Sequence, residues 1–200
     1  MNGDAQSYLR PYARAARQYG GGFKSLLWAS PHTQRQRFEA LARAVDFSGK
    51  NVLDLGCGRA DFLQYLIDRG TRPAHYVGLE ALQELVDAAR AKNLPNSLII
   101  KADFVREPAR MLVGADIVVF CGSLNTLDKA DFYSALRHAY AAAGELLVFN
   151  YLCSSRLAGA AWLTWHKPQD VLAFVGSLSS RYRTINDYID GDCTVAVERA

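Results

Sequence analysis

Residues 52–62 read VLDLGCGRADF and carry the strongest structural signal in the chain. An apolar run containing Asp54 ends in the turn Gly-Cys-Gly at 56–58. An apolar strand followed by such a turn is typical of the first strand of a doubly wound α/β sheet, where ligands bind beyond the carboxyl ends of the strands. The dinucleotide fingerprint has a third glycine where this chain has Asp61. The loop therefore either cradles phosphates or serves a cofactor of the opposite charge.

From about residue 50 onward the chain alternates strand and helix patterns. Apolar runs predict strands at 51–55, 75–80, 97–101, 115–120 and 145–151, and amphipathic stretches predict helices at 61–69, 82–92, 106–112, 129–143 and 168–179. This alternation favours a parallel sheet with right-handed crossovers. Two β-rich runs follow, YRTINDYI and CTVAVER, and Asp190-Gly191-Asp192 between them indicates an antiparallel hairpin.

We divide the chain into an N-terminal helical cap, residues 1–48, and an α/β domain, residues 49–200, which together form one compact unit. A chain of 200 residues is within the usual size of a single domain. Ser30-Pro31 indicates the start of a helix. Its apolar side would carry Phe38, Leu41, Ala42 and Val45.

The distribution of charge indicates which kinds of partner the protein can have. Residues 1–50 hold eight Lys or Arg and three Asp or Glu, a balance of +5, so the other 150 carry −2 of the net +3. No basic cluster typical of nucleic-acid binding is present, so a solvated helical face explains the basic excess better than an anionic substrate does. We expect a cytoplasmic protein. The first residues carry charges where a signal peptide is apolar, and the sequence has no run of roughly 20 apolar residues that could span a membrane.

The four cysteines lack metal-ligand spacing, so we expect no metal.

Acidic residues close three successive predicted strands. Asp54 would repel a pyrophosphate but attract an ammonium or sulfonium group. Glu80 can accept both hydroxyls of a ribose, and Asp103 can accept from an adenine amino group while Phe104 covers the ring. The set suits a ligand with adenine, ribose and a cationic amino-acid arm, and no phosphate.

Two other acids are expected to be structural. Asp116 opens the fourth strand and so lies at the far end of the sheet. Asp61 opens the helix expected at 61–69 and by itself predicts a helix cap.

Four segments, VLDLGCGRADF, YVGLE, KADF and ADIVVFCGS, are similar to motifs I to IV of the class I S-adenosylmethionine-dependent methyltransferases, and the terminal hairpin resembles theirs. The resemblance covers about residues 48–200 and implies a Rossmann-like seven-stranded sheet of order 3-2-1-4-5-7-6. It implies S-adenosylmethionine as cofactor and the following cofactor-binding residues: Asp54, Gly56, Cys57 and Gly58 at the amino-acid arm, Glu80 and Ala81 at the ribose, Asp103 and Phe104 at the adenine, and Cys121 with Gly122 beside the methyl group. SPHTQRQRF resembles an N-terminal motif of small bacterial members, which places Arg37 near the cofactor carboxylate.

Methyl transfer from a sulfonium is an in-line displacement that depends mainly on alignment, which contributes roughly 7–11 kcal/mol in well-oriented systems. A general base is optional, so no catalytic residue is assigned. The Pro-Cys pair of pyrimidine C5 transfer is absent at Phe120-Cys121, which favours a thiol that lines the site over a nucleophile. CGSLNT at 121–126 also lacks the Asn/Asp-Pro-Pro-aromatic motif of amino-group methylation in adenine or glutamine.

After the fourth strand, Ser123 and Asn125 could bind oxygens of the substrate. Asn125 could equally cap the helix expected near Leu127.

Substrate contacts are expected outside the cofactor core. The cap offers Tyr8, Tyr12, Tyr19, Trp28, Gln34 and Arg37, and the connection at 152–167, a candidate lid, offers Arg156, Trp162, Trp165 and His166. The alternative is that these rings pack the cap onto the sheet. His166 could act as a base or be an ordinary surface residue.

We therefore expect a methyltransferase acting on an O, N or S of a small-molecule acceptor, with no membrane partner and no signature of an oligomeric state. The alternatives are an RNA or protein methyltransferase and a non-catalytic module that binds S-adenosylmethionine or S-adenosylhomocysteine. A nicotinamide oxidoreductase is disfavoured by Asp54, the missing third glycine and the hairpin.

Overall fold

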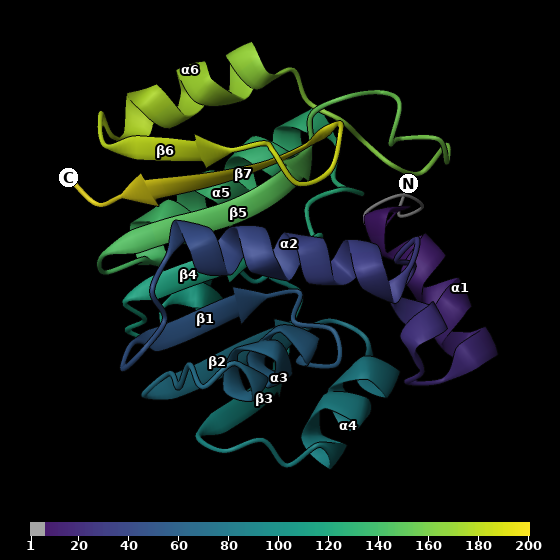
Figure 1. Cartoon of the computed structure of the whole chain (residues 1–200). Helices are drawn as coiled ribbons and strands as arrows, with labels where there is room; N and C mark the ends of the chain where they lie inside the picture. The colour runs from purple at the N-terminus through teal and green to yellow at the C-terminus, as the bar shows by residue number, and fades with distance from the viewer. Residues whose placement is uncertain (1–6) are drawn as a thin grey trace.

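The computed structural model describes residues 7–200, so the first six residues of the predicted cap lie outside the described residues. Seven strands form one sheet of order β3-β2-β1-β4-β5-β7-β6, as predicted (Figure 1). The strands are β1 Asn51–Leu55, β2 His75–Glu80, β3 Ser97–Lys101, β4 Ile117–Phe120, β5 Leu146–Leu152, β6 Tyr182–Ile185 and β7 Asp192–Glu198. The first five are parallel, and β7 runs antiparallel between β5 and β6.

Helices cover both faces of the sheet. The α-helices are α1 Arg10–Tyr19, α2 Pro31–Ala44, α3 Asp61–Asp68, α4 Gln83–Ala91, α5 Lys129–Ala142 and α6 Pro168–Leu178, with 3₁₀ turns η1 Ser7–Leu9, η2 Phe23–Leu26 and η3 Pro108–Met111. Apolar residues of α2, α3 and α4 pack with one face of the sheet, and those of α5 and α6 pack with the other. Successive side chains of β1 point to opposite faces of the sheet: Val52 packs on the side of α2, α3 and α4, and Leu53 packs on the side of α5 and α6.

Local sequence explains the helix beginning at Pro31. The Ser30 side chain accepts from the Thr33 backbone N–H at 3.1 Å, and the Thr33 hydroxyl accepts from the Ser30 N–H at 3.1 Å. This reciprocal capping box and Pro31 in the first turn fix the start of α2 where the sequence predicted it. Phe38 and Leu41 of α2 are buried against the sheet.

The remaining N-terminal segment, α1 and η2, lies beyond the carboxyl ends of the parallel strands (Figure 1). Asp116 lies at the opposite edge and accepts from the Asn51 backbone N–H at 2.8 Å, which agrees with its predicted structural role. Within residues 7–200 no helix is both long and apolar enough to cross a membrane.

The terminal hairpin is confirmed, but its turn differs from the prediction. β6 ends at Ile185, and residues 186–191 form the connection, rather than a tight Asp-Gly turn. Asp192 is already the first residue of β7 and is fully buried. The longer loop places Tyr188 beside β7, where its hydroxyl contacts Asp192 and Thr194.

Candidate functional site

A cavity of about 290 Å³ lies where the parallel strands end. Loops after four strands line its sheet side, with Gly56, Gly58, Glu80, Ala81, Asp103, Phe104, Cys121 and Gly122. The N-terminal segment lines the outer side, with Tyr8, Tyr12, Leu26, Trp28 and Arg37. The topology therefore gathers at one edge residues that are far apart in the sequence, which is where doubly wound sheets bind their ligands.

Glu80 at the end of β2 is held in place by two backbone donors. Its Oε2 accepts from the Gly58 N–H at 3.0 Å and its Oε1 accepts from the Leu82 N–H at 2.9 Å. Burial raises its pKa, and these N–H groups oppose that effect. Tyr12 lies nearby, and its own pKa is raised to about 12 by burial and by the charge of Glu80. A carboxylate fixed in this way is preorganised for hydroxyl donors from a ligand.

Asp103 after β3 is joined to the N-terminal segment. Its Oδ2 accepts from the Tyr8 hydroxyl at 2.8 Å, and its Oδ1 accepts from the Val105 N–H at 3.1 Å. Burial and this hydrogen bond raise the pKa of Tyr8, so the phenol remains a donor. Phe104 lines the cavity next to Asp103 and packs edge-on against Phe120.

Beneath the glycine loop, Asp54 is buried and does not line the cavity. Its Oδ2 accepts from the Tyr76 hydroxyl, whereas its Oδ1 has no hydrogen-bond partner within residues 7–200. Burial raises the pKa of Asp54 to about 7, and Tyr76 opposes that effect. The Cys57 side chain also lies below the loop, against Gly78, and Cys57 does not line the cavity although the resemblance placed it at the cofactor. No spacing in the sequence pointed to Tyr76 as the partner of Asp54.

Gly56 is the tightest point of the loop. Its φ is +75°, and a Cβ there would lie 2.5 Å from Ser123 Cβ. The Ser123 hydroxyl donates to the Leu55 carbonyl at 2.5 Å, so this neighbour is itself fixed. The loop after β1 and the loop after β4 therefore meet at a position where only glycine fits.

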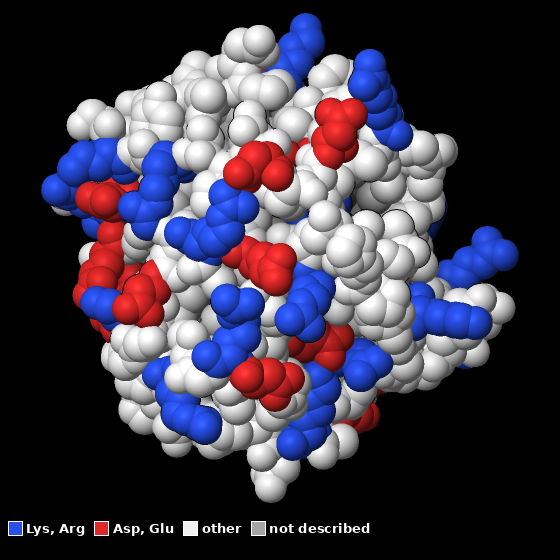
Figure 2. Space-filling view, in the orientation of Figure 1, with Lys and Arg blue, Asp and Glu red and all other residues white. Residues whose placement is uncertain are grey.

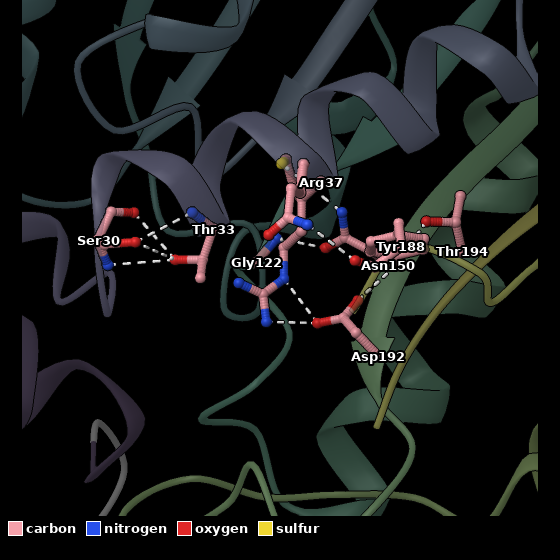
Figure 3. A network of polar contacts seen from close by, with 10 residues as sticks. Ser30, Thr33, Arg37, Gly122, Asn150, Tyr188, Asp192 and Thr194 are labelled. Carbon is pink, nitrogen blue, oxygen red and sulfur yellow. Dashed lines mark hydrogen bonds and ion pairs between the residues drawn. The ribbon is translucent and has the colours of Figure 1, made fainter. Parts of the chain in front are cut away.

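Arg37 of α2 lines the cavity and belongs to a buried polar network (Figure 3). Its Nε donates to Asp192 Oδ2 at 2.6 Å, and Nη2 contacts the same oxygen. Its guanidinium also lies 5.0 Å from the centre of the Trp28 ring. Arg37 is predicted to meet the cofactor carboxylate, and its guanidinium is already paired with Asp192. Asp192 lies 155 residues away in the chain, and the sequence did not indicate it as a partner.

The loop after β4 brings four polar or thiol residues to the cavity: Cys121, Ser123, Asn125 and Thr126. Burial raises the pKa of the Cys121 thiol, which agrees with a lining role and disfavours a thiolate nucleophile. The capping alternative for Asn125 is wrong, because Asp128 caps α5 by accepting from the Asp131 N–H at 2.8 Å. Asn125 is instead 8% exposed within the cavity wall.

Only part of the connection at 152–167 lines the cavity. Leu157, Trp162 and Leu163 line the cavity, and Trp162 packs edge-on against Tyr12 with ring centres 6.4 Å apart. Arg156 is exposed and pairs with Asp190, and Trp165 is also exposed.

His166 is neither a base at this site nor a surface residue. Its ring stacks on Phe132 with centres 3.8 Å apart and is buried, and burial lowers its pKa to about 4. It lies in the core on the α5 side of the sheet.

Three further expectations near the cavity need correction. Ala60, not Asp61, is the N-cap of α3, and it makes no side-chain cap. Asp61 contacts Lys92 instead and accepts from Gln34 at 3.3 Å, so both Asp61 and Gln34 serve packing between helices. Tyr19 is exposed and does not line the cavity.

The residues present fit the expected cofactor. Glu80 and Asp103 supply carboxylates at two separate points of the cavity wall. Beneath the loop, the buried Asp54 Oδ1 has no hydrogen-bond partner among residues 7–200 and is an acceptor for an ammonium group. The absence of a side chain at Gly56 lets Ser123 of the loop after β4 pack against the glycine loop. In the described part of the chain no three His, Cys, Asp or Glu side chains gather as metal ligands.

The sequence matches one family model. Residues 52–144 match the family described as a methyltransferase domain. No curated protein matches the sequence.

Solved structures of the same fold are more distant in sequence. The DhpI–SAM–HEP complex is 16% identical with a TM-score of 0.73, over 100% of this chain and 99% of that one. The magnesium protoporphyrin IX methyltransferase ChlM from Synechocystis PCC 6803 with bound SAM is 18% identical with a TM-score of 0.67, over 96% and 94%. The small RNA methyltransferase HEN1 is 13% identical with a TM-score of 0.67, over 86% of this chain and 26% of that one. At these identities the likeness shows the fold.

Proposed function

We propose that the chain is a class I S-adenosylmethionine-dependent methyltransferase and that its methyl acceptor is a small molecule. The observation that carries the proposal is the cavity itself. Its wall combines all of the predicted cofactor residues except Asp54 and Cys57 with a cover built from the N-terminal segment and the connection at 152–167. A volume of about 290 Å³ between these parts suits small ligands better than a macromolecule.

Surface charge supports the same proposal. On the face in Figure 2, Lys and Arg are interspersed with Asp and Glu rather than gathered in a stripe. Nucleic-acid-binding proteins usually concentrate basic side chains along the path of the phosphates. This face therefore does not favour an RNA acceptor.

We assign the cofactor contacts as follows. Glu80 and Ala81 bind the ribose, and Asp103 and Phe104 bind the adenine. The loop from Gly56 to Gly58 lies along the amino-acid arm, with Asp54 beneath the loop and Arg37 at the carboxylate of the arm. Cys121 lies beside the methyl group. The bound cofactor supplies a methyl group on a sulfonium. The chain's own contribution is to hold both reactants in line and to exclude water, which Trp28, Trp162 and Leu157 do as apolar cover.

The first experiment is calorimetric titration with S-adenosylhomocysteine, with NAD as a control ligand. Wild-type protein should bind S-adenosylhomocysteine and not NAD. Glu80→Ala should weaken that binding because it removes a fixed carboxylate. Glu84→Ala, an exposed acid on α4, should leave it unchanged. Equal affinities for the two variants would contradict the assignment of Glu80.

Turnover then tests the acceptor class. Incubation with S-adenosylmethionine labelled in the methyl group should place the label in a small-molecule fraction of a cell extract. Label found only in the RNA or protein fraction would overturn the small-molecule proposal.

A further inference from the structure

Asn125 is fixed at the meeting point of the loop after β4 and the connection at 152–167. Its backbone carbonyl accepts from the Thr164 N–H at 2.7 Å. Its side chain lines the cavity and is more than nine-tenths buried. Because Asp128 caps α5, the Asn125 amide is not needed to begin that helix.

The Asn125 side chain has an unused acceptor. Its Oδ1 is buried and has no hydrogen-bond partner in the described part of the chain. A buried carbonyl oxygen without a partner is costly, so such atoms in native proteins usually have a ligand, water or functional reason. Because this oxygen has almost no accessible surface, a donor in the cavity reaches it only when the amide turns about Cβ–Cγ.

The cavity wall around Asn125 is apolar and aromatic. Trp28 lies so close to Gly122 that a Cβ on that glycine would be 2.4 Å from its ring. Trp162, Leu157 and Leu163 continue the wall. Flat indole rings and leucine side chains favour a compact ring compound over a flexible polar one.

Charge on the acceptor is disfavoured. Among residues 7–200, Arg37 is the one cation that lines the cavity, and buried Asp192 already neutralises it. A carboxylate or phosphonate on the acceptor would have to compete with that ion pair. Glu80 and Asp103 lie on the side assigned to the cofactor.

We propose that Asn125 selects the methyl acceptor, and that the acceptor is a small uncharged ring compound whose O–H or N–H donates to Asn125 Oδ1. The inference rests on the proposed function, because it takes the remaining cavity beside the cofactor as the acceptor site. Asn125 is a specificity residue in this scheme, and the apolar wall supplies most of the contact.

Binding of matched probes to the complex with S-adenosylhomocysteine tests the proposal. The probes are 4-methylphenol and 1,4-dimethylbenzene, which differ by a hydroxyl in place of a methyl group. Wild-type complex should bind 4-methylphenol more tightly, by roughly fivefold for one buried hydrogen bond. Dissociation constants come from NMR titration at saturating S-adenosylhomocysteine.

Three variants test whether Asn125 is the source of the preference for 4-methylphenol. Asn125→Leu should lose the preference while S-adenosylhomocysteine affinity stays unchanged. Asn125→Asp keeps the size and an acceptor oxygen, so it should keep the preference. Asn186→Leu makes the same change at an exposed position and should behave as wild type.

Several outcomes would overturn the proposal. They are equal affinities for the two probes in wild type, a preference that survives Asn125→Leu, a preference lost in Asn125→Asp, or no binding of either probe. Failure of wild-type protein to bind S-adenosylhomocysteine would instead contradict the proposed function, so the two failures are distinguishable.

Discussion

Replacing Gly56 by alanine tests the packing that brings the glycine loop against the loop after β4. Gly56 has φ +75°, and an added Cβ would lie 2.5 Å from Ser123 Cβ. Gly70 offers a matched control in the same part of the chain. Its φ is +81°, and nothing lies within 4 Å of an added Cβ.

Both substitutions carry the cost of a left-handed backbone, and only Gly56→Ala adds a steric overlap. Left-handed backbone costs an alanine about 1–2 kcal/mol at either position. At Gly56 the overlap with Ser123 adds about 1–3 kcal/mol, the usual cost of overpacking a filled interior. Ser123 cannot move away freely because its hydroxyl donates to the Leu55 carbonyl. We therefore expect Gly56→Ala to lower the free energy of unfolding clearly more than Gly70→Ala does.

Urea unfolding followed by tryptophan fluorescence measures both losses. Gly56→Ala combined with Ser123→Gly should recover the part caused by overlap and keep the backbone part. Calorimetry should also show weaker binding of S-adenosylhomocysteine to Gly56→Ala alone, because the loop must shift. Equal losses of stability for Gly56→Ala and Gly70→Ala would refute the reasoning.

The other predictions concern buried charge. Arg37→Met or Asp192→Leu should each cost about 3–5 kcal/mol of unfolding free energy in urea, because each leaves a buried charge without its partner. The double change Arg37→Met with Asp192→Leu should cost much less than the sum of the two, and additive losses would contradict the pairing. Burial raises the pKa of Asp54 to about 7, above the unfolded value of about 3.9, so the folded state binds its proton more tightly. Its contribution to stability is therefore lost as pH rises from about 4 to 7, by up to about 4 kcal/mol, and Asp54→Asn should remove that loss in unfolding curves taken across this range. Burial lowers the pKa of His166 to about 4, below the unfolded value of about 6.5, so stability falls as pH drops from about 6.5 to 4, by at most about 3 kcal/mol. His166→Phe should flatten that fall and leave S-adenosylhomocysteine affinity unchanged; a variant as acid-sensitive as wild type would show that His166 is not the source.

Much of the fold follows from local pattern. The bounds of β1, β2 and β3 agree with the prediction, because short apolar runs bounded by polar residues specify buried strands directly. The capping box at Ser30 likewise fixes α2 from four residues of sequence. The predicted strand order is confirmed, but it came from the resemblance of four motifs and not from periodicity.

The errors share a cause. Asp61 and Asn125 were each assigned from their neighbours in sequence as helix caps, in the second case as one of two alternatives, yet Lys92 and the cavity wall decide their roles. His166 has no local signal for burial, and it is buried because α5 presents Phe132 to it. Composition and spacing describe what a segment can do, and they do not say which distant surface will meet it.

The class of sheet, the position of the glycine loop and the acids at the strand ends all follow from local sequence, because they depend on residues close together in the chain and on a fixed rule for where strands end. Tertiary structure alone decided that Asp54 lies beneath the loop with Tyr76, that Arg37 is paired with Asp192, and that Asn125 keeps an unused oxygen in the cavity wall. Each of these depends on burial and on a partner from another element. Burial changes the energy of a charge or a hydrogen bond far more than neighbouring residues in the sequence do.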